Sequence, residues 1–109
     1  MLPFHLDSYS KNDSLPVIKN LSCSVKARSA SVSFIGKANH TYYVLFELLG
    51  KGIAVKELVD APNQYQPSIT YRLDAIEATE GDAFRFTVTS DKDGKSDTRL
   101  GEPPQNGCK

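Results

Sequence analysis

Two cysteines, Cys23 and Cys108, carry the most reactive side chains of this 109-residue sequence. A structural zinc site needs four closely spaced ligands, so two distant cysteines do not suit one. One cysteine lies near the start of the patterned region and the other at its end, which suits a disulfide that ties the two ends together. Two free thiols are the alternative. In the chain-entropy model such a bridge stabilises by about 4 to 5 kcal/mol.

Only two histidines are present, His5 and His40, and neither lies in a catalytic motif. A nucleophile such as Ser33 or Cys23 would need a histidine beside it and a carboxylate to orient the ring. Paired carboxylates for glycoside hydrolysis would also need a cleft, which a chain of this length seldom builds. We therefore predict that the protein is not an enzyme and uses no cofactor.

Three aspartates, Asp91, Asp93 and Asp97, surround Gly94 and could supply oxygen ligands to calcium. The spacing differs from that of the twelve-residue calcium loop, and the closing glutamate is missing. Asp93-Gly94 is also a strong hairpin signal, because glycine accepts the positive φ that such turns require. We interpret the string as a turn and predict no metal site.

Exposed tyrosines are the best candidates for recognition, because an aromatic ring offers a large amphipathic surface. Tyr43 shares a strand face with Leu45 and Leu49, and Tyr65 lies in a polar stretch with Asn63 and Gln64. An exposed stripe through Tyr43 would predict dimerisation. The candidate binding residues are Tyr43, Tyr65, Asn63, Gln64, Asp91 and Asp93.

Asn12, Asn20 and Asn39 each begin an N-x-S/T triplet, the acceptor sequence for N-linked glycans. Three of the five asparagines thus fit, where fewer than one is expected from the frequency of serine and threonine. The pattern favours a secreted chain, although asparagine beside serine is also common in turns.

Composition excludes several partner classes. Thirteen basic residues balance thirteen acidic residues, so no net field attracts nucleic acid or an anionic membrane. The longest apolar run, 42–46, is far shorter than the roughly 20 residues of a spanning helix. The first ten residues lack the pattern of a signal peptide. We expect a protein partner, with a glycan as the alternative, and no nucleic acid or membrane span.

The elements that must position these side chains are short strands, because apolar and polar residues alternate between turn signals from Val17 onward. No segment keeps a helical period, and 74–81 is too short to stand alone as a helix. We expect 74–81 to cross between two sheets. The predicted strands are 21–27, 30–37, 41–49, 53–59, 68–73, 83–89 and 95–100.

Each predicted strand has one apolar face that must be buried against a second sheet. Seven such strands in about 100 residues predict an all-β Greek-key sandwich, with a small barrel as the alternative. The residues expected to point inward are Leu21, Cys23, Val25, Ala30, Val32, Phe34, Tyr42, Val44, Phe46, Leu48, Ile53, Val55, Val59, Ile69, Tyr71, Leu73, Phe84, Phe86 and Val88.

The stretch from Gly81 to Gly94, GDAFRFTVTSDKDG, preceded by Leu73 and Ile76, resembles the end of a fibronectin type III or related immunoglobulin-like repeat. The likeness lies in a strand that combines aromatic residues, an arginine and a valine, Phe84-Arg85-Phe86-Thr87-Val88, and is followed by a D-x-D-G hairpin. The resemblance implies an immunoglobulin-like sandwich that serves in adhesion, spacing or recognition. It carries no functional residue across, because the binding loops of the family vary.

The sequence therefore predicts a loose arm over 1–16, a sandwich domain over 17–102 and a tail over 103–109 that carries Cys108. We expect a non-catalytic recognition or structural module that binds another protein through loops at one end of the sandwich. The alternatives are a carbohydrate-binding module and an inhibitor that caps an enzyme with the loop 59–67. The expected location is extracytoplasmic: secreted, periplasmic or on a surface, where cell adhesion is one role.

Overall fold

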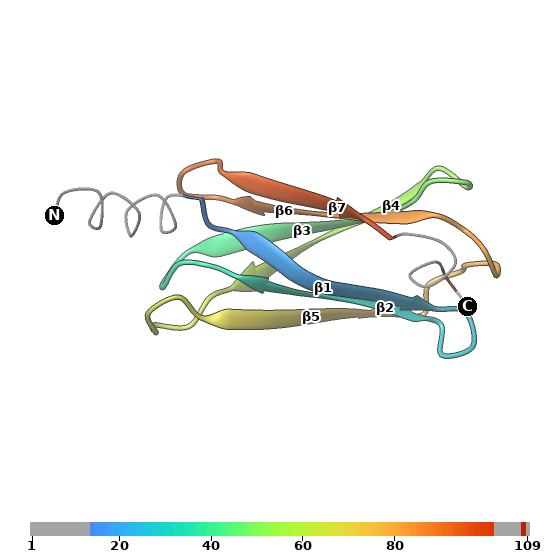
Figure 1. Cartoon of the computed structure of the whole chain (residues 1–109), viewed down its shortest axis with the longest axis horizontal. Coiled ribbons are helices and arrows are strands. Elements are labelled where there is room, and N and C mark those ends of the chain that lie inside the picture. The colour runs from blue at the N-terminus through green and yellow to red at the C-terminus, as the bar shows by residue number, and fades with distance from the viewer. Residues whose placement is uncertain (1–13, 102–107, 109) are drawn as a thin grey trace, which may run out of the picture.

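The computed structural model describes residues 14–101 and 108, and this part of the chain forms seven antiparallel strands (Figure 1). Residues 1–13, most of the predicted arm, lie outside the described residues, as does His5. The strands are β1 (Val17–Ser24), β2 (Ser29–Ile35), β3 (Thr41–Leu48), β4 (Ile53–Asp60), β5 (Ser68–Asp74), β6 (Phe84–Ser90) and β7 (Ser96–Leu100).

The strands form two sheets that pack face to face. One sheet has the order β1-β2-β5 and the other the order β4-β3-β6-β7. The chain changes sheet between β2 and β3, between β4 and β5, and between β5 and β6. The last of these connections is the crossing predicted over 74–81. The prediction of an all-β sandwich is confirmed.

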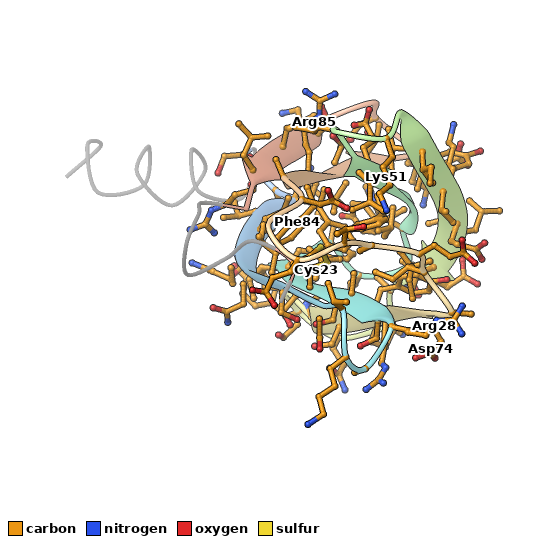
Figure 2. All side chains as sticks on the ribbon, turned by 90° about the vertical axis from the view of Figure 1, so that its right-hand side faces the viewer. Cys23, Arg28, Lys51, Asp74, Phe84 and Arg85 are labelled. Carbon is orange, nitrogen blue, oxygen red and sulfur yellow. A yellow bond between two sulfur atoms is a disulfide. The ribbon has the colours of Figure 1, made fainter. Side chains whose placement is uncertain are left out.

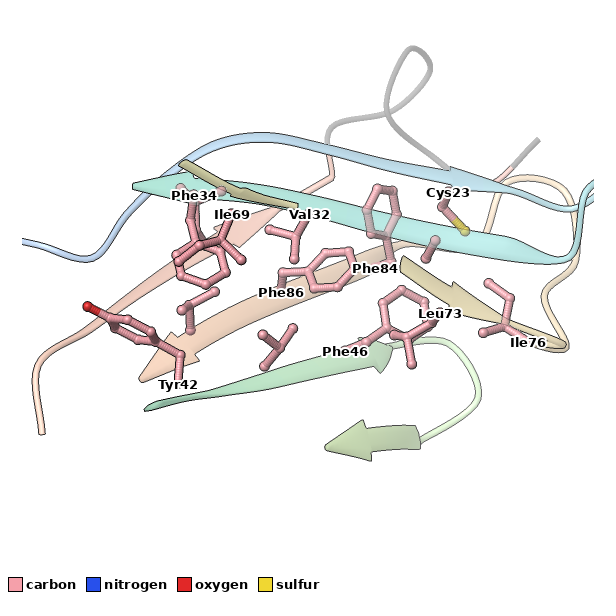
Figure 3. Packing of buried hydrophobic residues seen from close by; sticks show 14 of the residues in the cluster. Cys23, Val32, Phe34, Tyr42, Phe46, Ile69, Leu73, Ile76, Phe84 and Phe86 are labelled. Atoms are coloured by element: carbon pink, nitrogen blue, oxygen red, sulfur yellow. The ribbon is translucent and has the colours of Figure 1, made fainter. Parts of the chain in front are cut away.

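The core lies between the sheets because the alternation in each central strand places one face inward. β2, β3 and β6 alternate strictly between buried and half-buried side chains. Figure 3 shows Phe46, Phe84 and Phe86 together in this interior, with ring centroids 5.1 to 6.2 Å apart. Offset and edge-to-face contacts of this kind add to the stabilisation that comes from burying the rings.

The first strand differs from its prediction. It starts at Val17, four residues earlier than expected, and a register shift between Ile18 and Asn20 marks a bulge. A bulge inserts one extra residue and reverses the side-chain alternation. Ile18 and Cys23 can therefore both point inward although their positions differ by an odd number, which would place them on opposite faces of a regular strand. Leu15 and Pro16, which lie in the predicted arm, are buried and belong to the packed domain.

The disulfide between Cys23 and Cys108 is formed, which confirms the predicted bridge. It joins the end of β1 to the end of the chain, at the end of the sandwich that faces the viewer in Figure 2. Cys108 is fully buried, its carbonyl accepts the N–H of Gly81 at 2.8 Å, and its own N–H donates to the Asp82 carbonyl at 3.3 Å. Cys108 is therefore fixed both to β1 and to the loop before β6.

The two long sides of the sandwich differ. On one side β1 faces β7, and side chains of β7 bond to the backbone of β1. Asp97 accepts the N–H of Ile18 at 2.7 Å, and Arg99 donates to the carbonyls of Ile18 and Lys19 at 3.0 and 3.2 Å. This side is closed by hydrogen bonds between the sheets.

On the other side, β4 and β5 are the edge strands. A pocket of about 230 Å³ opens between the sheets there, lined mainly by apolar side chains such as Phe46, Val55 and Leu73. Burial raises the pKa of Tyr71 on β5, and its hydrogen bond to Glu57 on β4 raises it further. Ile53, predicted to point inward, is 40% exposed at this edge.

Candidate recognition site at the loop end

Three loops meet at the end of the sandwich opposite the disulfide (Figure 1). They are β2–β3 (36–40), β4–β5 (61–67) and β6–β7 (91–95), and we call them together the loop end. They meet because every strand runs antiparallel to its neighbours, so alternate connections fall at the same end. Five of the six predicted binding residues lie here: Asn63, Gln64, Tyr65, Asp91 and Asp93.

The β2–β3 loop is the centre of this cluster, because its side chains bond to both neighbouring loops. The Lys37 ammonium contacts the Asp93 carboxylate of the β6–β7 loop at 3.2 Å. The Asn39 amide donates to the Asn63 side-chain oxygen of the β4–β5 loop at 3.1 Å. Two loops that lie far apart in the sequence are thus connected through a third.

Backbone hydrogen bonds hold the same loops at their bases. Ala61 donates its N–H to the His40 carbonyl at 2.9 Å, and Asp91 donates to the Thr41 carbonyl at 2.8 Å. Gly36 donates to the Pro67 carbonyl at 3.0 Å. Each loop therefore leaves the sandwich from a fixed position.

Ser90 connects the end of β6 to the β2–β3 loop. Apart from the tyrosine hydroxyls, it is the one buried residue with a polar or charged side chain in the described part of the chain, at 2% exposure. The hydroxyl lies 3.0 Å from Nδ1 of His40, and it accepts the N–H groups of Lys92 and Asp93 at 3.3 and 3.5 Å. A hydroxyl this deeply buried is closed to a substrate, so we interpret the Ser90–His40 pair as a structural contact.

The aromatic ring of Tyr42 supports the base of the β2–β3 loop from the core. Its hydroxyl accepts the N–H of Lys37 at 2.7 Å, and the His40 ring stacks on it with centroids 6.1 Å apart. Burial raises the pKa of Tyr42, so the hydroxyl keeps its proton at neutral pH. A Cβ added at Gly36 would lie 2.8 Å from the Tyr42 ring, which explains why glycine stands there.

The Asp93 carboxylate is held in its charged form. Burial opposes the charge, but the Lys95 N–H, the Lys37 ammonium and the Ser90 hydroxyl together lower the pKa of Asp93. The N–H of Lys95 donates to Asp93 at 3.1 Å. The lowered pKa of Asp93 thus favours the charged carboxylate that contacts Lys37, and this contact links the two loops.

The β4–β5 loop has a buried base and an exposed tip. Ala61 and Pro67 at its two ends are buried, whereas Asn63 and Gln64 are exposed. Tyr65 is 83% exposed, the highest value among the large hydrophobic side chains that the structure describes as exposed. The tip thus presents an aromatic ring and two amide side chains to solvent.

Tyr43, the sixth predicted residue, lies elsewhere. It points to the outer face of the four-stranded sheet, where it pairs with Leu58 on β4 and Thr89 on β6. Its side chain is half-buried, and the Lys56 ammonium lies 4.5 Å from the ring centroid. Since Lys56 covers this ring, Tyr65 is the exposed aromatic side chain of the predicted set.

The three aspartates around Gly94 do not converge on one point. Asp93 bonds to Lys37 and Lys95, whereas Asp97 bonds to Ile18 on the side of the sandwich. Within residues 14–101 and 108, no cluster of three or more His, Cys, Asp or Glu side chains could hold a metal ion. Gly94 takes φ of 73° in the turn after β6, as the hairpin interpretation requires.

The glycan acceptor triplets fall at different places. Asn20 is exposed on β1, and Asn39 is exposed in the β2–β3 loop, while Asn12 lies outside the described residues. A glycan on Asn39 would be attached to the same side-chain nitrogen that donates to Asn63.

Sequence reasoning missed the residues that hold the loops together, namely Lys37, Asn39, His40 and Ser90.

A scan against protein-family models and searches of curated proteins and of solved structures found no match. In the part of the chain that the structure describes, no helix is long and apolar enough to cross a membrane.

Proposed function

We propose that this protein is a non-catalytic recognition module that binds another protein through the loop end. The observation that supports this most directly is the pairing of Lys37 with Asp93 and of Asn39 with Asn63, which connects three loops, one of which carries the exposed Tyr65. Loops that are fixed before binding lose less conformational entropy when a partner binds.

The chemistry of the exposed side chains fits protein recognition. Tyrosine is enriched among the residues that dominate binding energy, and it immobilises few torsions for its area. The amides of Asn63 and Gln64 add adaptable hydrogen bonds beside the ring. The disulfide supports an extracytoplasmic location, since such bonds persist in oxidising compartments.

The test is capture of the partner from extracellular or envelope fractions of the natural source, with three baits compared by quantitative mass spectrometry. The baits are the unchanged protein, Tyr65→Ala, and Leu49→Ala as a matched control. Leu49 is also an exposed apolar side chain, 40% accessible, but it lies in the β3–β4 hairpin at the opposite end.

We expect Leu49→Ala to retain the partner and Tyr65→Ala to lose it. With the purified partner, Tyr65→Ala should weaken the affinity by roughly tenfold or more, as truncation of a central aromatic anchor does. A partner that binds Tyr65→Ala as tightly as the unchanged protein, or that is lost with Leu49→Ala, would overturn the proposal.

A second candidate within the same class is inhibition of an enzyme by the β4–β5 loop. It is favoured by the buried ends of this loop, Ala61 and Pro67, and by its exposed tip at Tyr65. If the captured partner is an enzyme, the unchanged protein should abolish its activity and Tyr65→Ala should not. A captured enzyme whose activity is unaffected would exclude inhibition and leave recognition standing.

A further inference from the structure

The edge strand β4 carries an unusual combination for an exposed edge: apolar side chains together with unpaired backbone groups. Leu58 is 59% exposed and Ile53 is 40% exposed. The other three edge strands differ. Side chains of β7 make hydrogen bonds to the backbone of β1, so these two edges cover each other. The outward side chains of β5 are polar, with Arg72 and Asp74 paired at 2.8 Å.

The hydrogen-bond pattern shows which backbone groups of β4 face outward. Ala61 donates to the His40 carbonyl, and these residues continue the β3–β4 register in which Thr41 pairs with Asp60. Because antiparallel pairs alternate, Val55, Glu57 and Val59 bond to β3. The N–H and C=O groups of Lys56, Leu58 and Asp60 therefore point away from the sheet and are available to another strand.

We propose that β4 is a self-association surface on which the β4 strand of a second copy of this chain pairs antiparallel about a two-fold axis. Such an axis stands perpendicular to the sheet and keeps outer side chains facing outer side chains. The residue on the axis therefore pairs with the same residue of the second copy. Which residue lies on the axis depends on the side chains of β4.

Among the registers centred on 56 to 59, charge and the proline after β4 favour one. With Lys56 on the axis two ammonium groups face each other, and with Glu57 on the axis two carboxylates do so, which is unfavourable in both cases. With Leu58 on the axis, the two leucines meet and Lys56 of each copy lies opposite Asp60 of the other. With Val59 on the axis, Lys56 lies opposite Pro62, which has no N–H to donate.

The ion-pairing groups are placed for this register. Lys56, Leu58 and Asp60 all point to the outer face, because their β3 partners Leu45, Tyr43 and Thr41 do so. The Asp60 carboxylate accepts the Thr41 hydroxyl at 2.7 Å through one oxygen, which leaves the other oxygen for a lysine of the second copy. Because few residues pair, the interface buries little surface, and we expect a weak dimer.

Cross-linking through Leu58→Cys tests this pairing directly. On the axis, the two Cα atoms of a hydrogen-bonded pair lie about 5.5 Å apart, within the range that a disulfide spans. Leu100→Cys is the matched control, since Leu100 is 52% exposed on the outer face of β7. In a glutathione redox buffer we expect roughly tenfold or more covalent dimer from Leu58→Cys than from Leu100→Cys, because pairing raises the effective thiol concentration.

Charge exchange in the Leu58→Cys background tests the register. Lys56→Asp places two aspartates opposite each other, and Asp60→Lys places two lysines opposite each other, so each change should reduce the cross-link. The combined change restores opposite charges and should restore it. Tyr65→Ala should leave the cross-link unchanged, which separates this surface from the loop end. Equal cross-linking by Leu58→Cys and Leu100→Cys, or no recovery in the combined variant, would overturn the proposal.

Discussion

Ordinary residues hold the candidate site together, and no motif in the sequence points to their contacts with one another. Ser90 and His40 are separated by 50 positions, and Lys37 and Asp93 by 56. Alternation and turn signals are local properties, whereas these contacts depend on which loops the sheets bring together. The sequence could therefore indicate Tyr65, Asn63 and Asp93 as exposed turn residues, but it could not indicate the contacts that fix them.

The Lys37–Asp93 pair predicts a pH dependence. The pKa of Asp93 is lower in the folded state than in the unfolded chain, so its contribution is present above the unfolded pKa, near 4. That contribution is lost as pH falls through the folded pKa. We expect Asp93→Asn to be less stable at pH 7, by at most about 1 kcal/mol for a partly exposed pair, and this difference to shrink in acid. Urea unfolding at pH 7 and pH 3 measures it, and a difference that grows in acid would contradict it.

Gly36→Ala should destabilise the fold by roughly 1 to 3 kcal/mol, because the new methyl group would overlap the buried Tyr42 ring. Gly50→Ala is the control, since its nearest contact would be an ordinary 3.6 Å from Asp82. Chemical denaturation of the two variants provides the comparison. Equal stability of both would show that the loop base at Tyr42 is loosely packed.

The strands were largely predictable because each has a period of two and lies between turn residues. β2 to β7 begin and end within one or two residues of their predictions. β1 was misplaced because Lys19 and Asn20 interrupt its alternation, and only the bulge accounts for the interruption. The sheet pairing that brings three loops together is a property of tertiary structure, and the strand pattern did not contain it.

The contact between β1 and β7 predicts a loss of stability when the acceptor of the Ile18 N–H is removed. Asp97→Ala would leave the partly buried N–H of Ile18 without its acceptor, at a cost of about 1 to 3 kcal/mol. Thr98→Ala is a suitable control, because Thr98 is exposed and bonds to Thr87 on its own sheet. Thermal unfolding gives the stability, and amide exchange at Ile18 should accelerate in Asp97→Ala alone. Unchanged exchange at Ile18 would show that the bond does not form in solution.

The sandwich as a whole places the disulfide and the three connected loops at opposite ends. Recognition at the loop end should therefore depend little on the disulfide, as long as the domain stays folded.

Paired substitution Cys23→Ser and Cys108→Ser should lower the free energy of unfolding by roughly 3 to 5 kcal/mol, as loss of a long cross-link does. Partner binding should be retained at temperatures where the variant is folded. Denaturation and binding measured on the same sample test both parts. Loss of binding by a folded variant would show that the two ends are coupled.

Amide exchange of the complex with its captured partner shows directly whether the partner binds at the loop end. We expect protection on binding in 36–40, 61–67 and 91–95, with the loops 25–28, 49–52 and 75–83 unchanged. Protection confined to those latter loops, or to β4, would contradict it.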